Sequence, residues 1–327
     1  MDALSDVLRI IQLIGAVHLD GNFSAPWCVI GQADSALCSA YLPPSERVVS
    51  FHLLTEGKCF AMLPGDPASL VRAEAGDVIV VPQGETHVLG SATDLVPDVL
   101  APLLANQVET KPGEVMTLSH GGGGEVTRMV CGFLAPQDNS RNPLLRALPR
   151  LFKVNMRGSG VSWLESSLRF ATEEAASAQA GSATVLAKLA ELLFIEAVRR
   201  YIGTMADDGK GWLAGLRDRY VARALALMHS QPVYAWTVDA LAREVGISRS
   251  GLAQRFTELV GIPPMQYLAL WRLQLAARQL RLTDSSLASI AEGAGYESEA
   301  SFNRAFKREF GEPPATWRRN LGAARGR

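Results

Sequence analysis

An internal repeat occupies the C-terminal third of this 327-residue chain. The first copy, residues 237–268, reads TVDALAREVGISRSGLAQRFTELVGIPPMQYL, and the second, residues 286–317, reads SLASIAEGAGYESEASFNRAFKREFGEPPATW. Equivalent residues lie 49 positions apart before the turn in each copy and 50 positions apart after it. Two copies of one short pattern predict two copies of one small structural unit.

Each copy predicts a helix, a turn and a second helix. The first helix of the first copy carries an apolar stripe at spacing i, i+3, i+4 and i+7, formed by Val238, Leu241, Ala242 and Val245. Gly246 and Gly295 suit the helix ends because glycine tolerates positive φ. Ser248 and Ser298 stand where an N-cap opens the second helix. The buried anchors of the second helices are predicted to be Leu252, Phe256, Phe302 and Phe306.

The second helix of each copy leaves a polar face free. Side chains of this kind at the start of a recognition helix read base edges in the major groove, where Arg matches guanine and Asn or Gln matches adenine. We therefore predict DNA contacts from this face, with an ordinary solvated face as the alternative. The predicted DNA-binding residues are Arg249, Ser250, Ala253, Gln254, Arg255, Ala300, Ser301, Asn303, Arg304, Lys307 and Arg308.

The segment between the copies strengthens this interpretation. PPMQYLALWRLQLAARQLRL, residues 263–282, predicts one helix of about 19 residues and hence about 28 Å in length. That length approaches the separation of about 34 Å between successive major-groove faces on one side of B-DNA. One chain could therefore place its two reading helices in adjacent grooves.

Charge is divided unevenly along the chain, although its formal net charge is only -1. Residues 213–327 carry 16 Lys and Arg against 10 Asp and Glu, whereas residues 1–212 carry 16 against 23. This asymmetry is expected if only the C-terminal part meets a polyanion. Chance segregation of surface charge is the alternative.

Residues 217–320 resemble the DNA-binding domain of AraC/XylS-type transcriptional regulators. The resemblance rests on SIAEGAGY followed by ESEASFNRAFKREFGEPPATWR, residues 289–318. It implies base contacts from outward positions near the start of each reading helix. Ala253 and Gln254 stand where that family often has longer or basic side chains, so the second reading helix is expected to be the stronger reader.

Residues 1–140 predict β structure. Short apolar runs between Gly and Pro residues predict strands at 27–31, 47–54, 58–63, 77–82 and 125–134. The run GDVIVVPQGETH, residues 76–87, resembles the second motif of the cupin barrel, and the order of the runs resembles the cupin sensor module found in a subset of the same regulators. The expected fold class is α+β multidomain, with an N-terminal cupin-like β-barrel, a central helical segment and a C-terminal all-α double helix-turn-helix.

Four segments follow from these patterns: a cupin-like sensor domain at 1–140, a helical dimerisation segment at 141–203, a linker at 204–216 and the AraC-type double helix-turn-helix at 217–320. Helical patterns are expected over 162–178 and 182–202. The second of these helices has too many apolar residues for one narrow face, so we expect burial against the barrel and a homodimer partner. Those residues are Val185, Leu186, Leu189, Leu192, Leu193 and Ile195.

A cupin that holds a metal has two His and a Glu in its first motif. Here Ser50 stands at the position of the first His, which leaves His52, Glu56 and His87 as weak candidate ligands. We predict no metal and no other cofactor, and a pocket or structural role for the two His. A metal-dependent cupin enzyme fused to a DNA-binding domain is the alternative reading.

An effector pocket is expected in the barrel, with ordinary core packing as the alternative for each aromatic residue. Its predicted lining is Trp27, Phe51, His52, Phe60 and His87. Cys59 and Cys131 are candidate redox sensors, which would require an accessible and activated thiolate. Buried structural thiols are the alternative.

Together these features predict a sequence-specific DNA-binding transcriptional regulator, an activator rather than an enzyme, whose cupin-like domain senses a small molecule or a reactive species. The expected partners are double-stranded promoter DNA, RNA polymerase and that effector. The N-terminus carries acids before its apolar run, and no uncharged apolar stretch of about 18 residues is present. We therefore expect a cytoplasmic protein without membrane contact.

Overall fold

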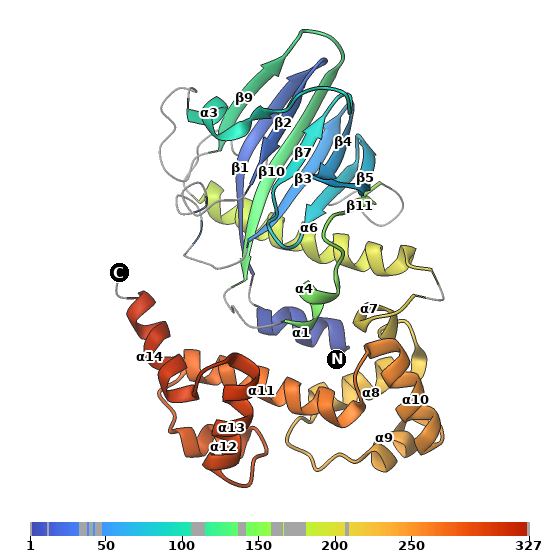
Figure 1. Cartoon of the computed structure of the whole chain (residues 1–327), viewed down its shortest axis with the longest axis vertical. Helices are drawn as coiled ribbons and strands as arrows, with labels where there is room; N and C mark the ends of the chain where they lie inside the picture. The colour runs from blue at the N-terminus through green and yellow to red at the C-terminus, as the bar shows by residue number, and fades with distance from the viewer. Residues whose placement is uncertain are drawn as a thin grey trace. The chain divides into compact units, whose positions relative to one another are not determined.

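The chain forms two compact units in the computed structural model, which describes residues 2–11, 13–32, 38, 42, 48–105, 115–136, 142–157, 166, 181–206 and 209–325. The sheet unit consists of Leu13–Asn139 and Leu148–Thr204. The helical unit consists of Met1–Gln12, Ser140–Ala147 and Met205–Arg327. The helical unit therefore combines the C-terminal repeat with two short segments from the first half of the sequence (Figure 1).

Two sheets make up the sheet unit. The six-stranded sheet has the order β11-β6-β3-β10-β1-β9, and the five-stranded sheet has the order β5-β4-β7-β2-β8. The strands of the first are β1 (Leu13–Ser24), β3 (Val49–Glu56), β6 (Asp77–Val81), β9 (Met116–Gly121), β10 (Val126–Pro136) and β11 (Phe152–Asn155). Those of the second are β2 (Cys28–Gly31), β4 (Lys58–Leu63), β5 (Asp66–Glu74), β7 (His87–Gly90) and β8 (Asp98–Val99), followed by helix α3 (Leu100–Ala105).

The two sheets share one apolar core. Leu19 of β1 and Leu54 of β3 belong to the same buried cluster as Ala61 of β4 and Leu89 of β7. The described strands do not close into a continuous barrel, because each sheet keeps its own edges. The expected cupin-like β domain is confirmed as this pair of sheets.

Five strands expected from the sequence are present as β2, β3, β4, β6 and β10. The structure adds β5, β7, β8 and β9, and also β1, a long strand between β10 and the edge strand β9; none of these was among the expected strands. Residues 152–155 form strand β11 beside β6, although they fall in the segment expected to be helical. The expected helix at 162–178 lies outside the described residues.

Helix α6 (Ser182–Thr204) covers one face of the six-stranded sheet (Figure 1). Contact with β1 is close: a Cβ on Gly15 would lie 2.5 Å from the Ala187 carbonyl oxygen. Glycine is therefore required for this approach. Leu193 and Phe194 are fully buried, whereas Val185 and Leu192 remain exposed.

The helical unit contains the two predicted helix-turn-helix copies. Its elements are α1 (Ala3–Ile11), α4 (Pro143–Ala147), α7 (Trp212–Gly215), α8 (Arg219–Ser230), α9 (Val238–Val245), α10 (Arg249–Val260), α11 (Pro264–Leu282), α12 (Leu287–Gly293), α13 (Glu299–Phe310) and α14 (Pro314–Arg325). No helix among the described residues is long and apolar enough to cross a membrane.

The predicted helix starts are confirmed, and so is the glycine end of α9. Helix α12 instead ends at Gly293 with Ala294 as its C-cap, and Gly295 follows with φ of 74°. The side chain of Ser248 accepts a hydrogen bond from the Gly251 amide, and that of Ser298 accepts one from the Ser301 amide. Gly246 has φ of 81° at the end of α9, a left-handed conformation that favours glycine. The connector α11 has the expected 19 residues.

Candidate functional site

Helices α10 and α13 present the polar residues that the sequence singled out. Their inner anchors, Phe256 on α10 and Phe306 on α13, are fully buried. The two anchors of each helix are four residues apart, so they share one face of that helix. The polar residues lie on the opposite face. Ser250, Gln254 and Arg304 are exposed, whereas Ala253 and Asn303 are partly buried.

On α10 the longer polar side chains already have partners within the chain. Arg255 binds Asp218, the N-cap residue of α8, with 2.5 Å between Nε and Oδ2. Gln254 donates from Nε2 to Glu258 at 2.8 Å. Arg249 pairs with Asp239 at 3.5 Å. Binding DNA through these groups would require breaking or sharing their present contacts.

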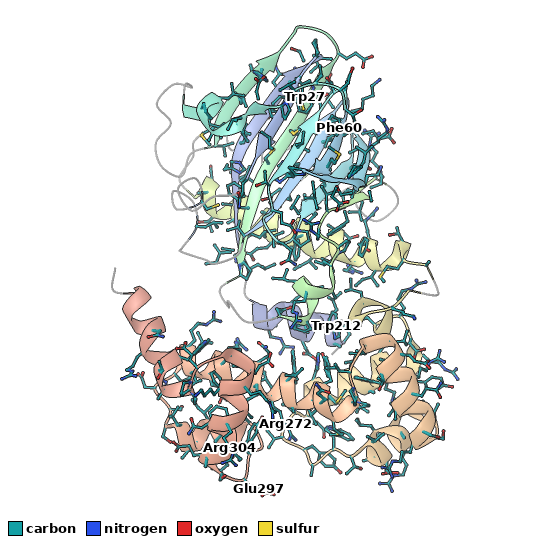
Figure 2. The ribbon with its side chains drawn as sticks, in the orientation of Figure 1. Trp27, Phe60, Trp212, Arg272, Glu297 and Arg304 are labelled. Carbon is teal, nitrogen blue, oxygen red and sulfur yellow. The ribbon has the colours of Figure 1, made fainter. Side chains whose placement is uncertain are left out.

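On α13 the corresponding side chains are uncommitted. Among the described residues, the side chains of Asn303, Arg304 and Lys307 form no hydrogen bond or ion pair, and Arg304, which Figure 2 labels, is exposed. Ser301 instead donates to the Ser298 carbonyl oxygen at 2.7 Å, a hydrogen bond within the first turn of the helix. The second reading helix thus offers free donors where the first offers occupied ones.

The sheet unit holds a small cavity of about 30 Å³ between its sheets. A cavity of this size can hold water but no larger ligand unless its walls move. Two of the five predicted pocket residues, His52 and His87, line it. The other lining residues are His18, Leu19, Phe23, Val29, Gly31, Gln32, Ser50, Leu89, Leu100, Met129, Cys131 and Phe133.

The other three predicted pocket residues are not among those lining the cavity. Trp27 packs in the shared core, where its ring stacks on Phe23 with 4.4 Å between centroids. Phe60 packs with Cys28 and Val88, and Phe51 is fully buried. Figure 2 shows Trp27 and Phe60 among the strands.

A series of hydrogen bonds links residues in the wall of the cavity, from Cys131 to Glu85. Cys131 lies opposite His52 in the pairing of β10 with β3, and His52 Nδ1 is 3.0 Å from the Cys131 sulfur. His52 Nε2 lies 2.7 Å from His87 Nε2. His87 Nδ1 in turn lies 2.8 Å from the carbonyl oxygen of Glu85.

One placement of the protons on these side chains satisfies every hydrogen bond in the series. The Glu85 carbonyl oxygen can only accept, so His87 carries its proton on Nδ1 and accepts at Nε2. His52 must then donate from Nε2 and accept at Nδ1, which leaves the Cys131 thiol as the donor to His52. Each ring is neutral in this arrangement.

Burial favours the same neutral forms. It lowers the pKa of His52 well below its usual value, with a further lowering by His87 and His18. Burial also lowers the pKa of His87 and raises that of the Cys131 thiol. Cys59, on β4, has its pKa raised to about 12 by burial and by Asp77. Both redox candidates are therefore protonated thiols at neutral pH, not activated thiolates.

The chain is expected to resist alkylation at Cys59 and Cys131 while it is folded. A pKa near 12 for Cys59 reduces its thiolate fraction by about 1,000-fold relative to an ordinary thiol, and burial restricts access further. Iodoacetamide labelling at pH 7.5, followed by peptide mass spectrometry, should therefore be at least about 100-fold slower in the native chain than in denaturant. Equal labelling rates in the two conditions would refute this description of the thiols.

The residues present do not fit a cupin metal centre. Glu56 is exposed and pairs with Arg128 at 3.4 Å. His52 and His87 point ring nitrogens at each other at hydrogen-bond distance, and Ser50 replaces a third imidazole. No group of three or more His, Cys, Asp or Glu in the described part of the chain is placed to hold a metal ion.

The sequence reasoning missed His18 as a cavity residue. It lies on β1, is buried, and stacks on Phe133 of β10 with 3.9 Å between ring centroids. The strand itself was not predicted, so nothing placed this histidine beside the others. A polar residue within the apolar run LIGAVHL was the available signal.

Comparisons with known proteins extend over nearly the whole chain. A family model described as Cupin matches residues 2–203, and one described as Helix-turn-helix domain matches residues 241–320. A putative AraC-like transcription regulator of Streptomyces antibioticus is 30% identical over 98% of this chain and 99% of its own length. The HTH-type transcriptional regulator AlkR of Acinetobacter baylyi is also 30% identical, over 97% of this chain and 99% of its own length.

A solved structure matches the C-terminal part. The DNA-binding domain of AdpA, a global transcriptional factor crystallised with a target DNA, is 29% identical and covers 34% of this chain and 98% of that chain, with a TM-score of 0.32. The two family models and the full-length relatives agree with the resemblance found in the sequence.

Proposed function

Because this chain belongs to the AraC-like family of transcription regulators and is a DNA-binding regulator of that kind, we propose that α13 is its main base-reading helix and that the cavity around His52 receives its effector. The observation that carries the first part is the contrast between the two reading helices. Arg304 and Asn303 are uncommitted on α13, whereas Arg255 and Gln254 on α10 have partners. In this proposal α10 mainly positions the protein on the DNA backbone.

Replacing Arg304 by Ala is expected to weaken specific binding by about 1–3 kcal/mol, because an Arg side chain can donate two hydrogen bonds to one guanine. Preferred sites would first be selected from random-sequence DNA with the full-length protein. Affinity for the selected site and for an unrelated duplex would then be measured at one salt concentration.

The matched control is Arg72→Ala, which removes the same charge from exposed strand β5 of the sheet unit. That variant should bind like the wild type. An Arg304→Ala protein that keeps the affinity and the sequence preference of the wild type would remove α13 from its assigned role.

The proposal for the effector rests on the cavity and its hydrogen-bond chain. The cavity is about 30 Å³, so an effector larger than a few atoms can enter only if lining side chains move. The bond between His52 and His87 joins β3 to the residue that begins β7 in the other sheet. An effector that replaces this bond would bind one arrangement of the sheets better than another, which is what a shift between two states requires.

Self-association through α6 remains part of the proposal. Val185, Leu189 and Leu192 lie at spacing i, i+4 and i+7, and the first and last of them are exposed. Replacing both Val185 and Leu192 by Lys should convert a dimer to a monomer in sedimentation equilibrium, whereas Ala183→Lys should not. An unchanged mass for the double variant would argue against this helix as the dimer interface.

Activation through RNA polymerase stays a prediction. We propose no catalytic role for the sheet unit, because its His and Glu residues do not form a cupin metal centre. Transcription in vitro from a promoter that carries the selected site would show the direction of the effect.

A further inference from the structure

The helical unit contains a second cavity, much larger than the one between the sheets. Its volume is about 400 Å³, within the range of pockets that hold small organic molecules. Most of its wall is apolar or aromatic and includes Val260, Leu270 and Trp271.

The cavity touches the elements that position the two reading helices. Val260 is the last residue of α10, and Glu309 lies in the last turn of α13. Tyr267, Leu270 and Trp271 belong to the connector α11 between them. Tyr267 also packs edge-on against Phe256, the buried anchor of α10, with 5.8 Å between centroids. A molecule in this cavity would therefore contact both reading helices and the connector at once.

The polar groups around the cavity favour a ligand that accepts hydrogen bonds. Trp271 is 3% exposed, and its buried indole nitrogen has no hydrogen-bond partner. A buried donor without an acceptor costs free energy that a ligand oxygen would recover. Gln274 is 5% exposed, and its side chain also forms no hydrogen bond among the described residues.

Two other side chains that line the cavity, Trp212 and Tyr267, already have hydrogen-bond partners. Trp212, labelled in Figure 2, donates from Nε1 to the Tyr267 hydroxyl at 2.9 Å, and that hydroxyl lies 2.8 Å from His229 Nε2. Among the residues that line the cavity, this leaves Trp271 and Gln274 with buried polar groups available to a ligand.

The charges at the edge of the cavity identify the ligand further. Arg146, on α4, is exposed, lines the cavity and forms no ion pair among the described residues. Glu309 also lines it but is engaged in an interaction of its own. An unpaired cation next to buried donors suits an anion whose remaining surface is apolar.

We propose that this cavity binds a small carboxylic acid with an aromatic or alicyclic body, and that its occupancy changes the affinity of the protein for DNA. The apolar body packs against Trp212, Leu270 and Trp271, and the carboxylate accepts from Trp271 or Gln274 and faces Arg146. This site is separate from the cavity around His52. Binding changes DNA affinity because the ligand contacts the end of α10, the end of α13 and the connector that spaces them.

The experiment uses the full-length protein with 3-phenylpropionate as the acid and 3-phenylpropionamide as its neutral analogue. Binding is measured by saturation-transfer NMR, and DNA affinity is measured with and without 5 mM acid. We expect the acid to bind at least about fivefold more tightly than the amide and to change DNA affinity at least about threefold. Arg146→Gln should bind acid and amide equally.

Two cavity-filling variants complete the test. Ala147→Phe and Leu270→Trp each place a larger side chain in the cavity, and either should abolish binding of both probes while the circular-dichroism spectrum stays that of the wild type. Absence of acid binding to the wild type at 5 mM, or undiminished binding to both filled variants, would overturn the site. Equal binding of acid and amide to the wild type would overturn the assignment of the ligand as a carboxylate.

Discussion

Replacing Phe306 by Ala is expected to destabilise the second helix-turn-helix by about 3–5 kcal/mol, the usual cost of removing a buried phenyl ring. Phe306 is fully buried. Its ring lies 5.5 Å from that of Phe302, 4.3 Å from Phe310 and 5.8 Å from Trp317, measured between centroids. Three rings from α13 and α14 thus surround that of Phe306, and replacing it by alanine would leave a cavity among them.

The loss of this ring should abolish specific DNA binding without touching a DNA-facing group. Phe306 lies on the inner face of α13, opposite the polar face that carries Arg304. A stability loss of this size is a large fraction of the stability of an ordinary domain. The second reading helix would therefore lose the packing that fixes it.

The measurement is urea unfolding followed by far-UV circular dichroism and tryptophan fluorescence, combined with affinity for a selected DNA site. Arg308→Ala, on the exposed side of the same helix, is the stability control and should change the free energy of unfolding by less than about 0.5 kcal/mol. A Phe306→Ala protein as stable as Arg308→Ala would contradict the packing described here.

The helix-turn-helix copies could be predicted from the sequence almost completely, because their determinants are local. An N-cap serine, a glycine at the helix end and an i, i+4 pair of anchors act over a few residues. Ser248, Gly246 and the 19-residue length of α11 were all expected, and all are observed. The repeat made the prediction stronger, because both copies carry the same cap, anchor and glycine positions.

The candidate sites depend on long-range contacts and were predicted only in part. The meeting of His52 with Cys131 is set by the register of β3 on β10, 79 residues apart in the sequence. The ion pair of Arg255 with Asp218 joins residues 37 positions apart and gives a predicted DNA contact a partner within the chain. Neither pairing has a signal in local composition.

The cavity in the helical unit was still less accessible to sequence analysis. Arg146 and Ala147 reach it from α4, in the first half of the chain, and Trp212 and Tyr267 reach it from the C-terminal part. The sequence assigned residues 141–203 to one helical dimerisation segment. Residues 140–147 instead belong to the helical unit. The composition of residues 140–147 cannot show that they pack in the helical unit and not with the strands that precede and follow them.

Acidification should destabilise the sheet unit more than the helical unit, because four of the five histidines are buried and three of those four lie in the sheet unit. Burial lowers the pKa of His18 from 6.5 to about 3. Burial also lowers the pKa values of His52 and His87. The helical unit contains His229 alone, whose pKa is lowered to about 3, again by burial.

The sign follows from linkage between protonation and folding. A buried neutral histidine contributes stability that is fully present above pH 6.5 and is lost as the pH falls toward its folded pKa, because only the unfolded chain takes up the proton. At pH 5, which is about 1.5 units below the unfolded value, each histidine with a folded pKa near 3 has lost about 2 kcal/mol. The sheet unit bears this loss at His18 and further losses at His52 and His87.

Hydrogen exchange of the full-length protein at pH 7.5 and pH 5.0, corrected for the intrinsic exchange rates, separates the two units. Protection in β3 and β10 should fall more steeply than protection in α9 and α11. His18→Phe keeps a ring to stack on Phe133 and removes one titrating group, so it should restore about 2 kcal/mol at pH 5 relative to its own value at pH 7.5. Equal losses of protection in the two units, or a pH dependence unchanged by His18→Phe, would show that these histidines are not buried in the neutral form, and the hydrogen-bond chain from Cys131 to Glu85 would lose its basis.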